Sequence, residues 1–234
     1  MRLDDPEVVR AEYASERRFA SRKAAFRFAD GADAREVTFD AIVEARPARY
    51  LEVGCGEGEL AERVQRELGS EVVALDQSER MVELTRARGV DARVGDVQAL
   101  PFENEEFDCT AAAWMLYHVP DIDQALSELA RVLRPQGRLV AVTNAREHLR
   151  ELAAALGTER QQLAFDGENA EELLGRHFGR VERREAYGWL TFPGRSEAQA
   201  YIDSSIVYAG RRLNQFDGPL RVRKAPVVFV AHKQ

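Results

Sequence analysis

The sequence predicts an α/β protein with a doubly wound, mostly parallel sheet. Short apolar segments alternate with amphipathic ones between Arg49 and Thr143. The first apolar segment also runs directly into three alternating glycines. Regular alternation of strand and helix favours a parallel sheet with helices on both faces. A chain of 234 residues is long enough for one such core and a small appended lobe.

The composition is that of an ordinary globular protein, with 45% hydrophobic and 31% charged residues. No apolar run approaches the ~20 residues of a membrane span. The first residues lack the apolar core of a signal peptide, so we expect a cytoplasmic location. The net charge of −7 argues against nucleic acid as the main partner. Cys55 and Cys109 fit reduced core residues better than a disulfide or a metal site, and no metal is expected.

The N-terminal part, residues 1–46, is expected to be helical. Asp4 or Asp5 precedes Pro6 and can cap a helix whose pattern continues toward Gly31. A second helix is predicted at about residues 34–45, ending before Pro47. The basic residues between positions 17 and 27 fit a solvated helix face. The functional alternative, which we adopt for the domain assignment, is a lid over the substrate.

The core is assigned to residues 47–188, followed by a cap insertion at 189–224 and a last core strand at 225–234. Seven strands are predicted, at 49–53, 71–75, 91–94, 107–113, 137–143, 180–187 and 226–231. Helices are predicted at 57–68, 78–88, 121–133, 146–155 and 168–177. Pro135 and Gly137 are expected to end the third of these helices. The insertion contains five aromatic residues among polar ones.

The glycine loop predicts a ligand site at the carboxyl end of the sheet. Backbone N–H groups and a helix N-terminus are exposed where such a strand ends. A nicotinamide fingerprint would need its third glycine at position 59, where Glu59 stands, because the third glycine is Gly58. Glu57 and Glu59 would also repel a pyrophosphate. A cationic ligand fits this loop better.

Further polar residues follow the next three predicted strands. Asp76 ends the second strand, where a carboxylate can accept hydrogen bonds from ribose hydroxyls. Asp96 follows the third strand, and Trp114 to His118 follow the fourth. Taken singly, Asp76 fits a helix cap and Asp96 a turn residue equally well. Their ordered occurrence favours one shared site.

Four segments together resemble the successive motifs of a known family. They are LEVGCGEGEL, VVALDQSERMVEL, VGDVQALPFENEEFD and AAAWMLYHVPDIDQALSELARVLRPQGRLVAVTN, spanning about Arg49 to Asn144. This order resembles the class I S-adenosylmethionine-dependent methyltransferases, in the small-molecule group that includes the ubiquinone/menaquinone C-methyltransferases. The resemblance implies a seven-stranded Rossmann-like fold, S-adenosylmethionine as cofactor and S-adenosylhomocysteine as product.

The resemblance also implies roles for individual residues. It places Glu52, Gly54, Gly56 and Gly58 around the methionine moiety of the cofactor, and Asp76 at the ribose. It places Gln77 and Met81 beside the adenine, and Asp96 and Val97 at the adenine amino edge. The backbone of Ala113 and Trp114 is placed at the cofactor's amino group. Many family members carry Asp at the position of Glu52. The longer Glu side chain keeps the negative charge and alters the local geometry. Acidic residues suit a ligand with sulfonium and ammonium groups.

Methyl transfer is an in-line displacement that requires alignment and needs a base only when the acceptor must lose a proton. His118 is the candidate general base, with Tyr117 as its orienting partner. The alternative is that this aromatic-His pair shapes the pocket wall.

The acceptor is not specified by the motifs. The Asn/Asp-Pro-Pro-Tyr/Phe sequence of base and glutamine-amide methyltransferases is missing after the fourth strand, where Ala113 to Leu116 stand. We expect a small-molecule acceptor between the N-terminal helices and the late insertion. The candidate substrate-binding residues are Tyr13, Phe19, Arg22, Trp114, Tyr117 and Trp189.

Two alternatives stay open. An RNA or protein methyltransferase could use a basic surface at Arg211, Arg212 and Arg221 to Lys224. A non-catalytic S-adenosylmethionine-binding module would keep the cofactor motifs without turnover. The sequence leaves the oligomeric state undetermined.

Overall fold

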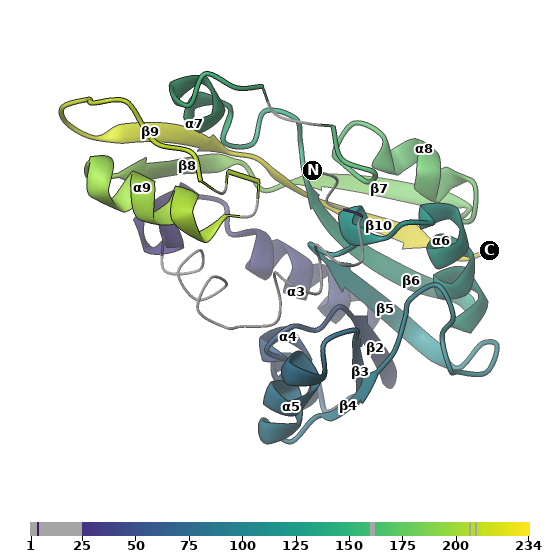
Figure 1. Cartoon of the computed structure of the whole chain (residues 1–234). Coiled ribbons are helices and arrows are strands. Elements are labelled where there is room, and N and C mark those ends of the chain that lie inside the picture. Colours follow the sequence, from purple (N-terminus) through teal and green to yellow (C-terminus); the bar gives the residue numbers. More distant parts are fainter. Residues whose placement is uncertain (1–3, 5–24, 160–161, 206, 209) are drawn as a thin grey trace.

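A computed structural model describes residue 4 and residues 25–159, 162–205, 207–208 and 210–234. The described chain forms two sheets, a central one of seven strands and a smaller one of three. Helices cover both faces of the central sheet, and the small sheet extends from one side of it (Figure 1). The predicted fold class is therefore confirmed.

The central sheet is mostly parallel. In sheet order its strands are β4 (Asp91–Val94), β3 (Glu71–Asp76), β2 (Arg49–Val53), β5 (Phe107–Ala113), β6 (Leu133–Asn144), β10 (Pro226–His232) and β7 (Arg180–Glu185). Only β10 runs against its neighbours, pairing antiparallel with both β6 and β7. The order changes direction at β2, which has β3 on one side and β5 on the other. Ligands bind at such a switch point in open α/β sheets.

The strands of the central sheet are buried on both faces because successive side chains point to opposite sides. Leu51 and Val53 belong to one core cluster and Tyr50 to the other. The helices α6 (Ile122–Val132) and α8 (Ala170–Gly175) pack in the first cluster. The second contains residues of α3 (Ala34–Ala45), α4 (Glu59–Leu68) and α5 (Glu79–Ala87).

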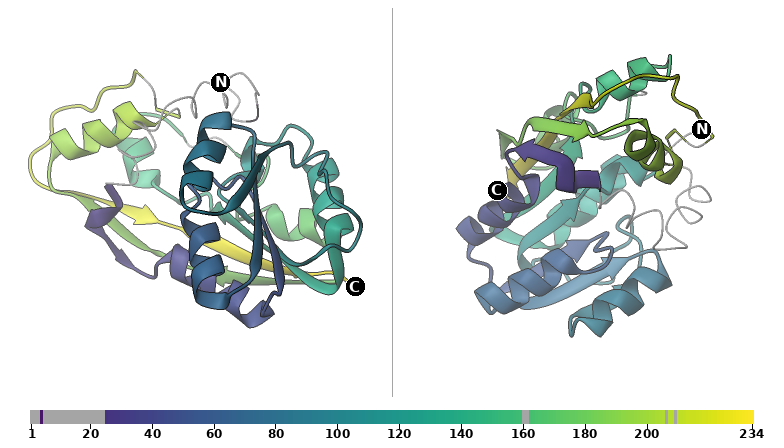
Figure 2. Two further views of the ribbon diagram at one scale, coloured as in Figure 1. Left: turned by 90° about the horizontal axis from the view of Figure 1, so that it is seen from below. Right: turned by 90° about the vertical axis from the view of Figure 1, so that its left-hand side faces the viewer.

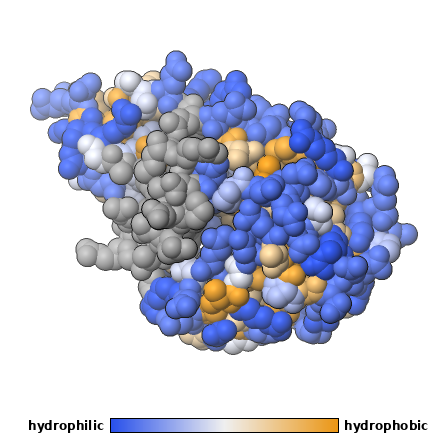
Figure 3. Space-filling view, turned by 45° about the vertical axis from the view of Figure 1, so that its right-hand side comes forward, coloured by the Kyte–Doolittle hydropathy of each residue, from blue (hydrophilic) through white to orange (hydrophobic). Residues whose placement is uncertain are grey.

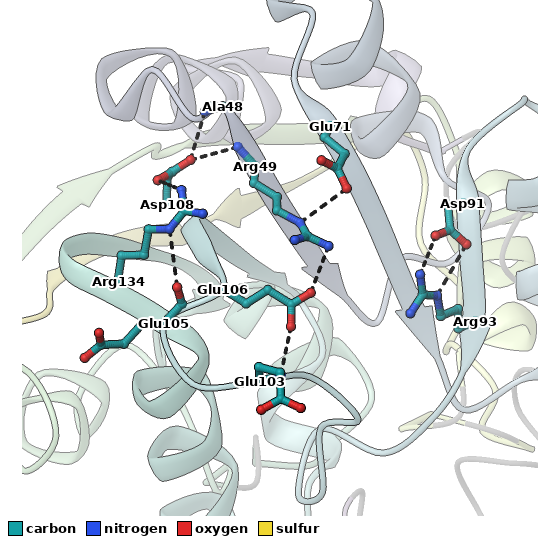
Figure 4. Close-up of polar contacts among 10 residues, drawn as sticks. All are labelled: Ala48, Arg49, Glu71, Asp91, Arg93, Glu103, Glu105, Glu106, Asp108 and Arg134. Atoms are coloured by element: carbon teal, nitrogen blue, oxygen red, sulfur yellow. Dashed lines mark hydrogen bonds and ion pairs between the residues drawn. The ribbon is translucent and has the colours of Figure 1, made fainter.

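Charged side chains connect the amino ends of the parallel strands (Figure 4). Asp108 accepts hydrogen bonds from the backbone N–H groups of Ala48 and Arg49 at 3.0 and 2.8 Å. The Arg49 guanidinium pairs with Glu106 at 2.8 Å and with Glu71 at 3.3 Å. These contacts lie at the edge opposite the glycine loop, so they contribute to register rather than to a ligand site.

The small sheet joins a strand from the N-terminal part of the described chain to two strands from its C-terminal part. Its order is β1 (Ala29–Gly31), β8 (Gly188–Phe192) and β9 (Leu220–Lys224), all antiparallel. A third core cluster includes residues of this sheet, α9 (Arg195–Ser204) and α7 (Arg150–Ala155). Figure 2 shows β1 in purple beside β8 in green, at one side of the larger sheet.

Several predicted boundaries were wrong. Phe26–Phe28 form a 3₁₀ turn followed by β1, not an α-helix reaching Gly31, and residues 5–24 lie outside the described part. The helix after the glycine loop begins at Glu59, not residue 57, because Gly58 caps it in a left-handed conformation. The helices predicted at 146–155 and 168–177 are shortened to α7 and α8. The predicted helix at 34–45 is confirmed.

Strand β6 begins earlier than predicted, at Leu133 rather than Gly137. Leu133 pairs with Phe107, and Arg138 pairs with Cys109. An advance of five residues along β6 therefore lies opposite an advance of two residues along β5. Gln136 has a φ of 65°, and Pro135 has no N–H to donate. Pro135 and Gly137 therefore mark a bulge within β6 rather than a turn before it.

The molecular face in Figure 3 is mostly hydrophilic, with apolar side chains exposed in small separate patches. Cys55 and Cys109 are free and buried, as expected of core residues. Among the helices of the described residues, none has the length and apolar composition of a membrane span.

Candidate functional site

The candidate site is built around the glycine loop, which leaves the carboxyl end of β2. Gly54, Gly56 and Gly58 have φ angles of 67°, 55° and 75°, a region that L side chains rarely adopt. A Cβ on Gly58 would lie 2.6 Å from the Thr85 hydroxyl, and one on Gly54 2.7 Å from the Met115 side chain. A Cβ on Gly56 would meet no atom within 4 Å. Gly56 therefore presents bare backbone to open space.

The loop is tied to the strand and helix beside it. Gly54 donates its N–H to the Leu75 carbonyl oxygen at 2.7 Å, and Gly56 donates to Asp76 Oδ2 at 3.0 Å. Thr85 Oγ1 donates to the Gly56 carbonyl oxygen at 3.0 Å. These bonds fix the loop before any ligand binds, so the site is preorganised.

Glu52 is a buried carboxylate beneath this loop. It is 3% exposed, and its Oε2 has no hydrogen-bond partner within the described structure. The backbone N–H of Ala61, in the first turn of α4, donates to the carboxyl group. Burial, followed by repulsion from the Asp76 carboxylate, raises the pKa of Glu52 to about 8. A buried acid with an unsatisfied oxygen suits a cationic ligand.

Asp76 is held at the end of β3 by backbone donors. Its Oδ1 accepts from the Ser78 N–H at 2.9 Å. Burial raises the pKa of Asp76, and the bonds from Ser78 and Gly56 oppose this rise. The cap of α5 is Ser78, whose side chain accepts from Met81 N. Asp76 is therefore not the N-cap, and its carboxyl group belongs to the loop contact.

A cavity of about 830 Å³ runs along this carboxyl edge, within the size range of small-molecule sites. One end is lined by Glu52, the glycine loop, Asp76 and Gln77. The other end is lined by residues from the region of the small sheet and from after β6. These include Phe26, Ala29, Gly31, Asn144, His148, Tyr201 and Lys224.

Most of the predicted site residues line this cavity. They are Glu52, Gly54, Gly56, Asp76, Gln77, Val97, Ala113, Trp114, Tyr117 and His118. Other predicted residues are placed elsewhere. Gly58 is the N-cap of α4, Met81 is 1% exposed within the core, and Asp96 is exposed and accepts the Gln98 N–H at 2.9 Å. Tyr13, Phe19 and Arg22 lie outside the described residues.

Trp189 is not part of the cavity lining. It is half-buried on β8, and the guanidinium carbons of Arg221 and Arg223 lie 4.4 and 5.3 Å from its ring centroid. These arginines are on the strand that pairs with β8. The ring therefore stacks with cationic side chains of the small sheet rather than with a ligand in the cavity.

The segment after β5, a strand that lies between β2 and β6, also lines the cavity. Trp114 has a φ of 55°, and its N–H donates to the Val142 carbonyl oxygen at 2.9 Å. Leu116–His118 form a 3₁₀ turn. The rings of Tyr117 and His118 meet edge to face, with centroids 4.5 Å apart. Both side chains therefore reach the cavity from one rigid turn.

Sequence reasoning missed several residues that shape the site. Thr85 is fully buried and contacts the loop through its hydroxyl, and its only sequence signal is its place on the apolar face of α5. His148 belongs to none of the motifs identified in the sequence, and Tyr201 was predicted only as one of the five aromatic residues of the insertion. Lys224 was grouped with Arg221 and Arg223 as one basic surface, and this grouping was wrong. Strand alternation places Lys224 with buried Val222 on the opposite face.

Comparison with known proteins shows that the chain is similar to methyltransferases. Residues 51–141 match the family model described as a methyltransferase domain. The demethylmenaquinone methyltransferase of Staphylococcus aureus is 29% identical over 182 residues, covering 73% of this chain and 71% of that protein. The ubiquinone biosynthesis O-methyltransferase of Xanthomonas oryzae is 38% identical over 119 residues, 48% of this chain and 49% of that protein.

A solved structure agrees with this result at the level of the fold. A Thermotoga maritima protein described as an S-adenosylmethionine-dependent methyltransferase has a TM-score of 0.57 and 22% identity, covering 94% of both chains. For several curated relatives, the matched region spans only a third to about half of their length.

Proposed function

We propose that the chain is a class I S-adenosylmethionine-dependent methyltransferase, which transfers a methyl group from S-adenosylmethionine to a small-molecule metabolite. The accepting atom is O, N or C, and S-adenosylhomocysteine is the second product. One observation carries the proposal. Two acidic side chains, Glu52 and Asp76, border a glycine loop with open backbone at one end of a large cavity.

The residues present fit this cofactor. The unsatisfied Glu52 Oε2 supplies a buried acceptor for a cationic group, and the space above Gly56 admits a ligand close to the backbone. Asp76 accepts backbone hydrogen bonds from Gly56, Gln77 and Ser78 and retains acceptor capacity beyond them, which suits ribose hydroxyls. Gln77 and Val97 also line this end, as expected for the adenine side.

When bound, the cofactor supplies an electrophilic methyl group on a sulfonium sulfur. The chain contributes position. The loop donates hydrogen bonds to Leu75 and Asp76 and accepts one from Thr85, and the turn after β5 also lines the cavity. An in-line displacement gains most of its rate from such alignment. The acceptor belongs at the other end of the cavity, beside Trp114, Tyr117 and Tyr201.

His118 is the proposed base for an acceptor that must lose a proton. Its ring lines the cavity and meets Tyr117 edge to face. We expect H118N to lower kcat by about 10²–10⁴-fold for such an acceptor, while KM for the cofactor stays unchanged. Unchanged kcat at saturating cofactor would assign His118 to the pocket wall.

The remaining assignments stay proposals. We propose that the lid at residues 1–46 and the cap at 189–224 enclose the acceptor, because the described part of the first segment pairs with the second in one sheet. The cytoplasmic location stays a prediction. The described residues contain no group of three or more His, Cys, Asp or Glu side chains that could hold a metal ion.

The direct test of the activity uses methyl-labelled S-adenosylmethionine and a metabolite extract, followed by mass spectrometry. We expect a small molecule in which the labelled methyl group has replaced a hydrogen of the precursor, with S-adenosylhomocysteine formed in equal amount. Label in RNA or protein would favour the alternative substrates. Cofactor binding without labelled product would favour a non-catalytic module.

A further inference from the structure

Lys224 is a buried cation in the wall of the cavity. It ends β9 and is 7% exposed. One of its three N–H groups donates to the Ala32 carbonyl oxygen at 2.8 Å. Within the described residues it forms no ion pair with a carboxylate. Burying a charge without a counter-charge is costly, so the position favours a negatively charged ligand.

The backbone around Lys224 is held in place from two directions. The Ala225 N–H donates to His148 Nδ1 at 3.0 Å, and the Leu149 N–H donates to the Arg223 carbonyl oxygen at 2.7 Å. On the other side, Lys224 pairs with Gly188 of β8. The backbone that carries the Lys224 side chain is therefore fixed, which lowers the entropy cost of binding a ligand at the ammonium group.

Charge is separated along the cavity. Glu52 is on β2, whereas Lys224 lies two residues before Pro226, which pairs with Asn144 at the end of β6. The path from β2 to β10 crosses β5 and β6, which is three strand spacings of about 4.8 Å, or roughly 14 Å. The acidic end suits the cationic cofactor, and the buried lysine lies at the end left for the acceptor.

We propose that Lys224 binds a carboxylate of the methyl acceptor, so that the substrate class is a small aromatic or apolar acid. This inference rests on the proposed function for its two-ended cavity. Phe26, Trp114 and Tyr201 line the cavity and supply apolar surface for the body of such a molecule. A single ammonium group suits a singly charged carboxylate, whereas a phosphate is usually held by several donors.

The test measures binding of matched acids and amides to the full chain saturated with S-adenosylhomocysteine. The probe pairs are benzoic acid with benzamide, phenylacetic acid with phenylacetamide, and indole-3-acetic acid with indole-3-acetamide. We expect at least one acid to bind about tenfold or more tightly than its amide, by calorimetry or ligand-observed NMR. K224M should abolish this preference, and K224R should retain part of it.

The matched control is K233M, which removes a lysine that directly follows β10. Lys233 Nζ donates to the Leu133 carbonyl oxygen at 2.6 Å and does not line the cavity. K233M should leave the preference for the acid unchanged. This comparison separates a local contact from the loss of one positive charge on the whole protein.

Three results would overturn the inference. One is equal binding of each acid and its amide to the wild-type chain, including no binding of either up to about 10 mM. Another is an unchanged preference in K224M. The third is weaker S-adenosylhomocysteine binding in K224M with no effect on the acids, which would assign Lys224 to the cofactor's own carboxylate. Failure of the wild-type chain to bind S-adenosylhomocysteine would instead contradict the proposed function, and the acid pairs can then be measured alone.

Discussion

Glu52 is an acid held where water cannot solvate its charge. Its burial and the nearby Asp76 raise its pKa to about 8, so the carboxyl group is largely protonated near neutral pH. A cation bound beside Oε2 would favour the charged form and lower this pKa. Cofactor binding is therefore expected to release a proton from this residue at pH values below about 8.

The first prediction concerns stability. The pKa of Glu52 is higher in the folded chain than in the unfolded one. Its contribution to the free energy of unfolding is therefore fully present below pH 4.5 and is lost as pH rises to about 8. E52Q removes this loss. We expect its unfolding free energy to exceed that of the wild type by an amount that grows from pH 5 to pH 8, on the order of 2–4 kcal/mol at the upper end.

Urea unfolding at several pH values measures this difference. E103Q is the control, because Glu103 is exposed and its replacement removes the same charge. Parallel stability curves for E52Q and the wild type across this pH range would show that Glu52 carries no raised pKa.

The second prediction separates the conformation of a glycine from its place in the site. Gly56 and Gly69 both have positive φ angles, 55° and 68°, and a Cβ at either would meet no atom within 4 Å. Gly56 lines the cavity, whereas Gly69 is the C-cap of α4. We expect G56A and G69A each to lose about 1 kcal/mol of stability, because alanine is strained in this conformation.

Only G56A should also weaken S-adenosylhomocysteine binding, by at least about tenfold, because its methyl group occupies the open space over the loop. Calorimetry on both variants measures the effect. Equal affinities would mean that no ligand approaches the backbone at Gly56.

The residues of the cofactor end were predictable because a strand, a loop and a helix follow each other in sequence there. Gly56 and Asp76 are each identified by their position after a predicted strand, and both line the cavity. Thr85 and Lys224 were not predictable in this way. Their roles depend on which residues fold back against them, and no local spacing encodes such contacts.

At the scale of elements, the acceptor end depends on two distant segments that meet in the small sheet. Gly31 of β1 pairs with Gly188 of β8. A Cβ on Gly188 would lie 2.1 Å from the Asp30 carbonyl oxygen. The two backbones therefore approach more closely than any side chain permits, and this contact positions the Ala32 carbonyl oxygen that binds Lys224.

The third prediction follows from this contact. G188A should separate β1 from β8 and cost about 1–3 kcal/mol of stability, because the added methyl group meets backbone that cannot shift without breaking the pairing. Amide hydrogen exchange in residues 29–31 should accelerate, while S-adenosylhomocysteine affinity changes little. G175A is the control, since a Cβ there meets no atom within 4 Å. Unchanged exchange in G188A would contradict this account of the pairing.

The elements of the central sheet were largely predictable, and those of the small sheet were not. Strands such as 226–231 are buried on both faces and form continuous apolar runs. Strand β9, Leu220–Lys224, alternates basic and apolar residues within a polar region, so its basic residues suggested a surface. Its partner strand is 28 residues earlier at its nearest end, and pairing at such separation has no local signal.

At the scale of the whole molecule, the two edges of the central sheet carry different chemistry. The amino edge has paired charges such as Asp108 with Arg134 at 2.6 Å. The carboxyl edge has carboxylates beside the switch point of the strand order and a buried lysine toward the far side. This division places ligand chemistry at one edge and structural ion pairs at the other.

The measurement that tests the central claim most directly is calorimetric titration of the full chain with S-adenosylhomocysteine, for the wild type and two Asp variants. D76N alters the carboxylate at the end of β3, and D91N alters one at the start of β4, where it pairs with Arg93. We expect one-to-one binding to the wild type with a Kd of about 1–100 μM, an affinity at least about tenfold weaker in D76N, and no change in D91N. Absence of binding to the wild type, or equal affinities for all three proteins, would contradict the account.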